Sequence, residues 1–261
     1  MRKVASYLLL LVTLTGCNNS KVADNETTPP ITKKENGIEI PNNQVVDHYK
    51  ILLMGNSHVK GLEHILTELI KARFAEKSIT TFNAPGIGYL SDRINDEKSL
   101  DSLKSTSWSH VILQAQKYST TGAYTYPTKA AISFIKLSKN QNATPIMFPE
   151  HPQYKNKREG LEVFLLHKGI AEEEAACVAP IGLAWNRAIE LHPELNLHNP
   201  DGNHANTTGK LLTAFVFYEI ITGESADALP YISSIDVDKL TQNALKQIAS
   251  YSLGQNPACS Y

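Results

Sequence analysis

Two short segments, far apart in the chain, carry residues whose types and spacing could perform nucleophilic catalysis. In the first, Ser57 follows the apolar run 50–54 and a turn containing Gly55, and a helical pattern of apolar residues comes next. A serine at such a turn lies beside backbone N–H groups and the positive end of a helix dipole. This setting suits a hydroxyl nucleophile whose attack creates an oxyanion. The alternative is that Ser57 serves only as part of a helix N-cap.

The second segment is Asp201-Gly202-Asn203-His204, which precedes another helical run. A carboxylate three residues before an imidazole can hold one ring nitrogen, fix the tautomer and leave the other nitrogen free for a nucleophile. Polar residues before a helix are also ordinary capping residues. Together, Ser57, Asp201 and His204 predict a Ser-His-Asp triad, provided that the two segments meet in space.

The elements that must position these residues alternate between strand and helix along the chain. We expect strands at 50–54, 79–83, 110–113, 144–148 and 177–181, and helices at 59–75, after Pro127, and at 161–176, 183–191, 209–222 and 237–253. This alternation predicts an α/β fold, a three-layer α/β/α sandwich with a central parallel sheet and sites at the carboxyl ends of the strands. Ser57, Gly88, the segment 114–116 and the segment 149–151 all follow expected strand ends.

With both segments in place, the chain resembles the SGNH (GDSL-type) hydrolases, whose fold is flavodoxin-like. That family carries its nucleophile in a Gly-Asp-Ser-like block after the first strand and an Asp-x-x-His block near the C-terminus. Here the blocks read Gly55-Asn56-Ser57-His58 and 201–204, with Asn56 where many relatives have Asp. The stretch 180–185, Pro-Ile-Gly-Leu-Ala-Trp, looks like a late segment of one bacterial branch. The resemblance spans residues from about 49 to 231.

The resemblance also implies N–H donors for an oxyanion. The Ser57 N–H is one, and a glycine after the second strand is another, which is Gly88 or Gly86 here. The third donor in many relatives is an Asn, whereas this chain has Gln114 and Gln116 in that region. A Gln amide can donate in the same way. Strand alternation puts both Gln side chains on one side, so the sequence does not separate them.

The N-terminus has the pattern of a secretory signal. Two basic residues precede a short apolar run, which ends in Leu14-Thr15-Gly16-Cys17. This ending resembles a bacterial lipobox, which implies removal of residues 1–16 and lipidation of Cys17. The polar stretch 17–48 is expected to be a flexible tether, followed by the hydrolase domain at 49–261. We therefore expect an exported protein of the cell envelope, anchored to a membrane by its lipid.

The amino-acid composition bears on the kind of binding partner and on the state of the cysteines. The chain has 25 Lys and Arg against 26 Asp and Glu, a balance that does not suggest nucleic acid as a partner. Two cysteines remain beyond Cys17, and an exported compartment permits a bridge between Cys177 and Cys259, although a buried free thiol at Cys177 is equally compatible with its apolar segment. Trp108 and Trp185 are expected in the core.

Two histidines and the turn before Ser57 allow other roles. His151 is expected in an exposed loop rather than against a substrate. His58 could be a metal ligand, but no spacing typical of a zinc site supports this, and no metal or organic cofactor is expected. A phosphate-binding turn at 55–57 would leave the second block unexplained.

The expected activity is hydrolysis of short acyl esters by a serine esterase. The exported location and the family's range suggest O-acetyl groups on carbohydrate as substrates, with other small-molecule esters, including lipid esters, left open. The alternative is a non-catalytic surface lipoprotein that binds glycan in the same cleft.

Overall fold

The structure, a computed structural model, describes residues 39–261, and its core is one parallel sheet of five strands. The strand order is β2-β1-β3-β4-β5. The strands are β1 (His48–Met54), β2 (Ser78–Asn83), β3 (His110–Gln114), β4 (Thr144–Phe148) and β5 (Cys177–Val178). All four neighbouring pairs are parallel, as expected for strands that alternate with helices.

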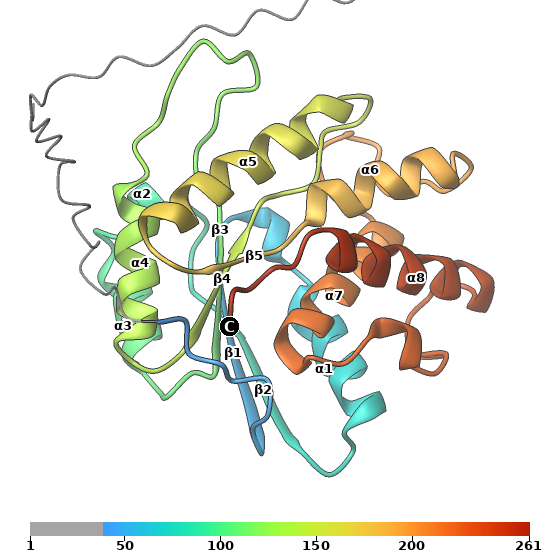
Figure 1. The fold of residues 1–261 in the computed structure, drawn as a ribbon, viewed down its shortest axis with the longest axis horizontal. Helices are drawn as coiled ribbons and strands as arrows, with labels where there is room; N and C mark the ends of the chain where they lie inside the picture. Colours follow the sequence, from blue (N-terminus) through green and yellow to red (C-terminus); the bar gives the residue numbers. More distant parts are fainter. Residues whose placement is uncertain (1–38) are drawn as a thin grey trace, which may run out of the picture. The chain divides into compact units, whose positions relative to one another are not determined.

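Helices cover both faces of this sheet (Figure 1). They are α1 (Leu62–Arg73), α2 (Leu90–Arg93), α3 (Glu97–Lys104), α4 (Lys129–Lys139), α5 (Lys157–Glu173), α6 (Ile181–Leu191), α7 (Thr207–Thr222) and α8 (Lys239–Gln255), with short 3-10 helices η1 (Ser57–Val59) and η2 (Ala226–Ala228). In β1, Ile51 and Leu53 pack with α1, α6, α7 and α8, while Leu52 and Met54 pack with the opposite layer. This alternation follows from the two-residue period of a strand. The predicted α/β/α sandwich is confirmed.

The strand order indicates where in the sheet the candidate site lies. In an order of 2-1-3-4-5, the direction of winding reverses between β1 and β3, and parallel sheets of this type bind ligands at the carboxyl ends of the strands beside that point. Ser57 follows the carboxyl end of β1, and Gln114 is the last residue of β3. The topology therefore brings the loop before Ser57 and the end of β3 together.

The local elements differ from the expectations at three places. The helix expected at 59–75 is divided into η1 and α1, because Gly61 takes a left-handed conformation with φ of 87°. Strand β5 has two residues instead of the expected five, since α6 begins directly after Pro180. Helix α3 was not expected, because it is short and carries few apolar residues.

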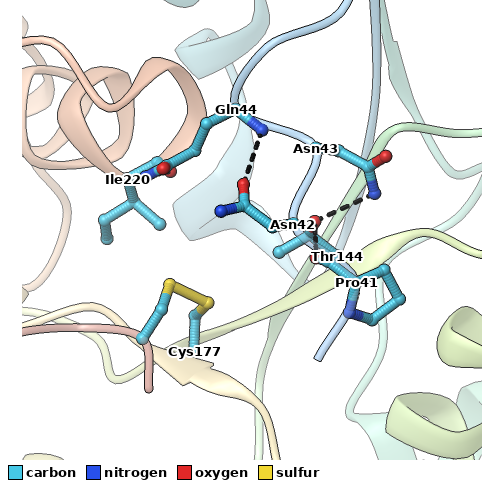
Figure 2. Close-up of a disulfide and its surroundings, with 8 residues drawn as sticks. Pro41, Asn42, Asn43, Gln44, Thr144, Cys177 and Ile220 are labelled. Atoms are coloured by element: carbon cyan, nitrogen blue, oxygen red, sulfur yellow. Dashed lines mark hydrogen bonds between the residues drawn. A yellow bond between two sulfur atoms is a disulfide. The ribbon is translucent and has the colours of Figure 1, made fainter. Parts of the chain in front are cut away.

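The residues before β1 lie against the domain. Ile40 is buried, and the Asn43 side chain donates to Thr144 Oγ1 at 3.0 Å (Figure 2). Gln44 donates its amide to the Ile220 carbonyl at 3.3 Å. The last residues of the segment expected to be a tether, from residue 39 onward, are thus packed onto the folded domain.

A disulfide joins Cys177 of β5 to Cys259 near the end of the chain (Figure 2). The Val178 N–H also donates to the Ala258 carbonyl at 2.8 Å, so the C-terminal segment is held beside β5 by both bonds. Of the two possibilities for Cys177 that composition left open, the structure shows the bridge.

The predicted signal peptide, lipobox and Cys17 lie outside the described residues, as does most of the predicted tether. Within residues 39–261, no helix combines the length and the apolar character needed to cross a membrane.

Candidate active site

The two segments singled out in the sequence meet at the carboxyl edge of the sheet. Ser57 Oγ lies 2.8 Å from His204 Nε2, and His204 Nδ1 lies 2.6 Å from Asp201 Oδ2. Ser57 belongs to η1 directly after β1, and the other two residues belong to the loop before α7. The structure therefore brings all three predicted triad residues into one chain of hydrogen bonds.

The loop around Asp201 is built to hold its carboxylate. Asp201 Oδ1 accepts the backbone N–H groups of Asn203 and His204, each at 2.9 Å, while Oδ2 faces the imidazole. Gly202 makes this turn with φ of 70°, a conformation that glycine adopts without strain. The backbone N–H donors, followed by the His204 ring, hold the pKa of Asp201 well below its usual range. An ionised carboxylate only accepts hydrogen bonds, so it keeps the proton of His204 on Nδ1.

The backbone around Ser57 is fixed on both sides. The Asn56 side chain caps η1 by accepting the His58 N–H at 3.0 Å, and the Asn56 N–H donates to Gln114 Oε1 at 2.8 Å. Among the described residues, the Ser57 N–H has no hydrogen-bond partner. It is thus free to donate to a group that approaches Ser57 Oγ.

Ring contacts lead from His204 of the triad through two further histidines to a tryptophan. The His204 ring stacks on His58, with centroids 5.0 Å apart, and His58 meets His151 edge-on at 5.1 Å. His151 in turn stacks on Trp185 at 4.0 Å and bonds the Asn203 carbonyl through Nε2 at 3.0 Å. Burial lowers the pKa of His58 to about 4 and that of His151 to about 3, so both rings are neutral near pH 7.

The expectation of an exposed loop position for His151 is wrong, because its side chain is buried between the triad loop and the core. Trp108 and Trp185 are buried as expected, and Trp185 supports the site through His151. Within residues 39–261, no three His, Cys, Asp or Glu side chains gather in a way that could hold a metal ion.

A cleft of about 460 Å³ opens over Ser57 and His204. Polar and aromatic side chains make up its walls: Asn56, Ser57, His58, Tyr89, Lys117, Tyr118, Thr120, Tyr126, Glu150, Gln153, Asn203 and His204. No aliphatic residue is among those lining it. The Lys117 ammonium lies 4.6 Å from the centre of the Tyr89 ring, so these two residues form one wall of the cleft.

The two glycines considered as oxyanion donors lie beside this cleft rather than in its walls. Gly86 and Gly88 line a neighbouring hollow of about 340 Å³, while the next residue, Tyr89, lines the cleft over Ser57. Gly86 has φ of 75° and shapes the turn. The donor role of either glycine stays a prediction.

Both glutamine side chains are buried and bind groups of the protein itself. Gln114 accepts the Asn56 N–H and donates to Glu150 Oε2 at 2.5 Å. Gln116 donates its amide to two backbone carbonyl groups of the loop that follows β3. Neither side chain is among those lining the cleft, so the structure does not place a Gln amide at the expected oxyanion position. That role stays a prediction.

Two charged residues at the site were not singled out from the sequence. Arg93 is buried and donates to the Gly55 carbonyl, but no spacing marks it, since α2 is a single turn. Glu150 lines the cleft and contacts Gln114. A signal existed for Glu150, because it follows the end of β4 at the same edge of the sheet as Ser57.

The chain resembles known proteins in fold more than in sequence. No protein-family model matches the chain, and no curated protein matches it at a significant level. Solved structures do match. A DUF4886 family protein from Bacteroides uniformis is 16% identical, with a TM-score of 0.64, and the match covers 82% of this chain and 97% of that one.

Two further structures share the fold. A protein from Slackia heliotrinireducens, described as a candidate SGNH hydrolase, is 17% identical over 67% of this chain and 99% of its own, with a TM-score of 0.51. A catalytic mutant of an acetylxylan esterase from Geobacillus stearothermophilus is 16% identical over 67% and 95%, with a TM-score of 0.53. The chain therefore has the α/β fold of the SGNH hydrolases, as its two sequence blocks predicted.

Proposed function

We propose that this protein is a serine esterase that hydrolyses short acyl esters, with O-acetyl groups on carbohydrate as the favoured substrates. The observation that carries the proposal is the hydrogen-bonded chain from Ser57 Oγ through His204 to Asp201. The fold shared with an acetylxylan esterase structure supports the reaction class.

The mechanism follows from the tautomer of His204. Because the Asp201 carboxylate takes the Nδ1–H, Nε2 carries a lone pair directed at Ser57 Oγ. His204 removes the Ser57 proton as Oγ attacks the ester carbonyl, and the imidazolium that forms is stabilised by Asp201. The same proton then goes to the leaving alkoxide, and water, activated by His204, releases the acyl group from Ser57.

Charge that develops on the carbonyl oxygen requires donors near Ser57. The Ser57 N–H is unpartnered among the described residues and is the first donor in this proposal. The Gly88 N–H is the second, with Gly86 as its alternative. The Gln amide expected from the sequence as a third donor is not part of this proposal, since the Gln114 and Gln116 amides donate to other groups of the protein.

The walls of the cleft favour a short acyl group on a hydroxyl-rich molecule. A long acyl chain gains about 0.8 kcal/mol for each CH₂ it buries against apolar surface, and no aliphatic side chain lines this cleft. Lys117, Gln153 and Asn203 instead offer hydrogen bonds, and Tyr89 and Tyr126 offer flat rings against which sugars pack. This lining supports a carbohydrate rather than a lipid substrate.

The test compares p-nitrophenyl esters of two, four and eight carbons, followed by release of acetate from acetylated xylan. We expect turnover to fall with chain length and to disappear in Ser57→Ala with the fold retained. A wild-type protein that turns over none of these esters and reacts with no fluorophosphonate at Ser57 would refute the proposal. Binding of glycan without turnover would then identify the non-catalytic alternative.

We also propose that the protein acts at the cell envelope, attached through a lipid on Cys17. The lipobox-like ending at residues 14–17 supports this. Mass spectrometry of the mature N-terminus should find a diacylated Cys17, and Cys17→Ala should release the protein from the membrane fraction. A mature N-terminus that lacks lipid would contradict it.

A further inference from the structure

The Gly55–Asn56 peptide, one peptide group before the one that carries the Ser57 N–H, is held at both ends by buried side chains. The Gly55 carbonyl accepts Arg93 Nε at 3.0 Å and Arg93 Nη2 at 2.5 Å. At the other end of the same peptide, the Asn56 N–H donates to Gln114 Oε1 at 2.8 Å. Rotation of this peptide would break the contacts at both of its ends. Because Ser57 is the next residue after Asn56, the orientation of this peptide helps to fix the positions of the Ser57 N–H and Oγ.

Gln114 extends this chain to a carboxyl group. Its side chain is fully buried, and because Oε1 faces an N–H donor, its NH₂ group must face Glu150, at 2.5 Å from Oε2. The order of groups is therefore the Arg93 guanidinium, the Gly55–Asn56 amide, the Gln114 amide and the Glu150 carboxyl. Both amide dipoles point in the same direction between a cation and a carboxylate.

Arg93 is anchored by other contacts as well. Its Nη1 donates to the Pro85 carbonyl and to Ser99 Oγ, and its Nη2 donates to the Gly86 carbonyl at 2.8 Å. Arg93 also reaches the carboxylate of Asp96 through the Ser99 hydroxyl. One guanidinium thus joins the loop before Ser57 to the loop that carries the candidate donor glycines.

The carboxyl end is also enclosed. Tyr118, from the loop after β3, and Glu159, from α5, face Glu150, while Lys117 lines the same cleft, as do His58 and His204. Burial is the main cause that raises the pKa of Glu150 to about 7, with Glu159 adding to it. The charge of Glu150 therefore changes in the range in which an esterase is assayed.

We propose that Arg93, Gln114 and Glu150 are positioning residues, which together hold the Gly55–Asn56 peptide so that the Ser57 N–H faces the oxyanion. The part that concerns catalysis rests on the proposed function. A cation at one end and a carboxylate at the other polarise the two amides in the same sense, which strengthens all the hydrogen bonds between them. When Glu150 takes up a proton, this support weakens and the peptide is held less firmly.

The first test does not depend on activity. In a His204→Gln background, which removes the titration of the neighbouring imidazole, the ¹H–¹⁵N signal of Asn56 is followed from pH 5.5 to 8.5. We expect the Asn56 amide shift to titrate with a midpoint near 7, the value at which Glu150 changes charge. The titration should vanish in Glu150→Gln and persist in Glu159→Gln, the matched control, since Glu159 bonds Tyr118 and the Gln153 N–H instead of Gln114.

The second test is a double-mutant cycle on kcat with p-nitrophenyl acetate. Glu150→Gln keeps an acceptor for Gln114 but loses its charge, so kcat at pH 8 should fall about tenfold, and Arg93→Lys should also lower it. The two effects should be non-additive when combined, whereas Arg93→Lys with Glu159→Gln should be additive.

The outcomes separate the two proposals. The positioning role would be overturned if the titration of the Asn56 signal were the same in Glu150→Gln as without it. Additive effects of Arg93→Lys and Glu150→Gln on kcat would also overturn it. If Arg93→Lys fails to fold, the titration with Glu150→Gln and Glu159→Gln still decides. A wild-type protein without esterase activity whose Asn56 signal titrates through Glu150 would refute the esterase while leaving the structural chain intact.

Discussion

A Cβ atom on Gly55 would lie 2.3 Å from Gln114 Oε1, because the backbone before Ser57 runs directly against the end of β3. Gly55→Ala must therefore displace the Gln114 side chain, which accepts the Asn56 N–H. We expect stability to fall by about 1–3 kcal/mol, as in other overpacked sites. Esterase activity should fall at least about tenfold, because a small displacement of catalytic groups costs more rate than stability.

Gly169→Ala is the matched control for this substitution. A Cβ on Gly169, inside α5, meets no atom within 4 Å beyond its chain neighbours and the backbone of its own helix. Alanine is a better helix former than glycine, so the control should be neutral or stabilising by up to about 1 kcal/mol, with unchanged activity. Equal losses from both alanine variants in urea unfolding and ester turnover would contradict the steric argument.

Asp201→Asn should lower kcat by about a thousandfold or more while the protein stays folded. Asn keeps an oxygen for the backbone N–H groups of Asn203 and His204, but its NH₂ group would face His204 Nδ1 and favour the wrong tautomer. Asp238→Asn is the control, since Asp238 caps α8 in a similar way, with backbone donors at 2.9 and 3.0 Å. Thermal melts and kcat should separate the two variants, and similar kcat values would refute the tautomer argument.

His167→Phe should reduce the sensitivity of the protein to mild acid. His167 is buried in α5, and burial lowers its pKa from 6.5 to about 4. Between these values the unfolded chain binds a proton that the folded protein does not, so the histidine's contribution to stability is complete above pH 6.5 and is lost as the pH falls toward 4.

The measurement for His167 is urea unfolding at several pH values in that window. The free energy of unfolding should fall less steeply in the variant than in the wild type, by up to about 1.4 kcal/mol per pH unit. His64→Phe, at an exposed position on α1, is the control for the substitution itself. If the free energy of unfolding depended on pH in the same way in the wild type and in His167→Phe, the pKa of the buried ring would not be lowered and the prediction would be wrong.

Removal of the disulfide should destabilise the domain without changing its chemistry. Cys177 and Cys259 are 82 positions apart, and closing a loop of that length stabilises a protein by about 4.5 kcal/mol in the chain-entropy model. Cys259→Ser should therefore lower the melting temperature clearly, and the wild type in reductant should melt like the variant. Free thiols at Cys177 and Cys259 in the oxidised, folded protein would show that the disulfide is absent.

Part of the site could be predicted from the sequence because its residue types are restrictive. A serine after a strand and an Asp-x-x-His block before a helix leave few chemistries. The alternation of apolar runs placed Ser57 at the carboxyl edge of a sheet, while its contact with the second block was a condition of the prediction. The structure joins Ser57 to His204 at the expected contact. The donor role predicted for Gln114 and Gln116 stays a prediction, because a side chain at a strand end has several possible partners and Gln114 binds Asn56 and Glu150.

What the amino-acid order alone determined was the layered α/β architecture and the identity of the three residues in the hydrogen-bonded chain, since both depend on local periodicity and on residue type. Only the tertiary structure decided how the Gly55–Asn56 peptide is held. Arg93, Gln114 and Glu150 come from three different segments, and they meet because β1, β3 and β4 are neighbours in the sheet. Buried hydrogen bonds of this kind depend on which unpaired groups the fold brings together, and no spacing along the chain records that.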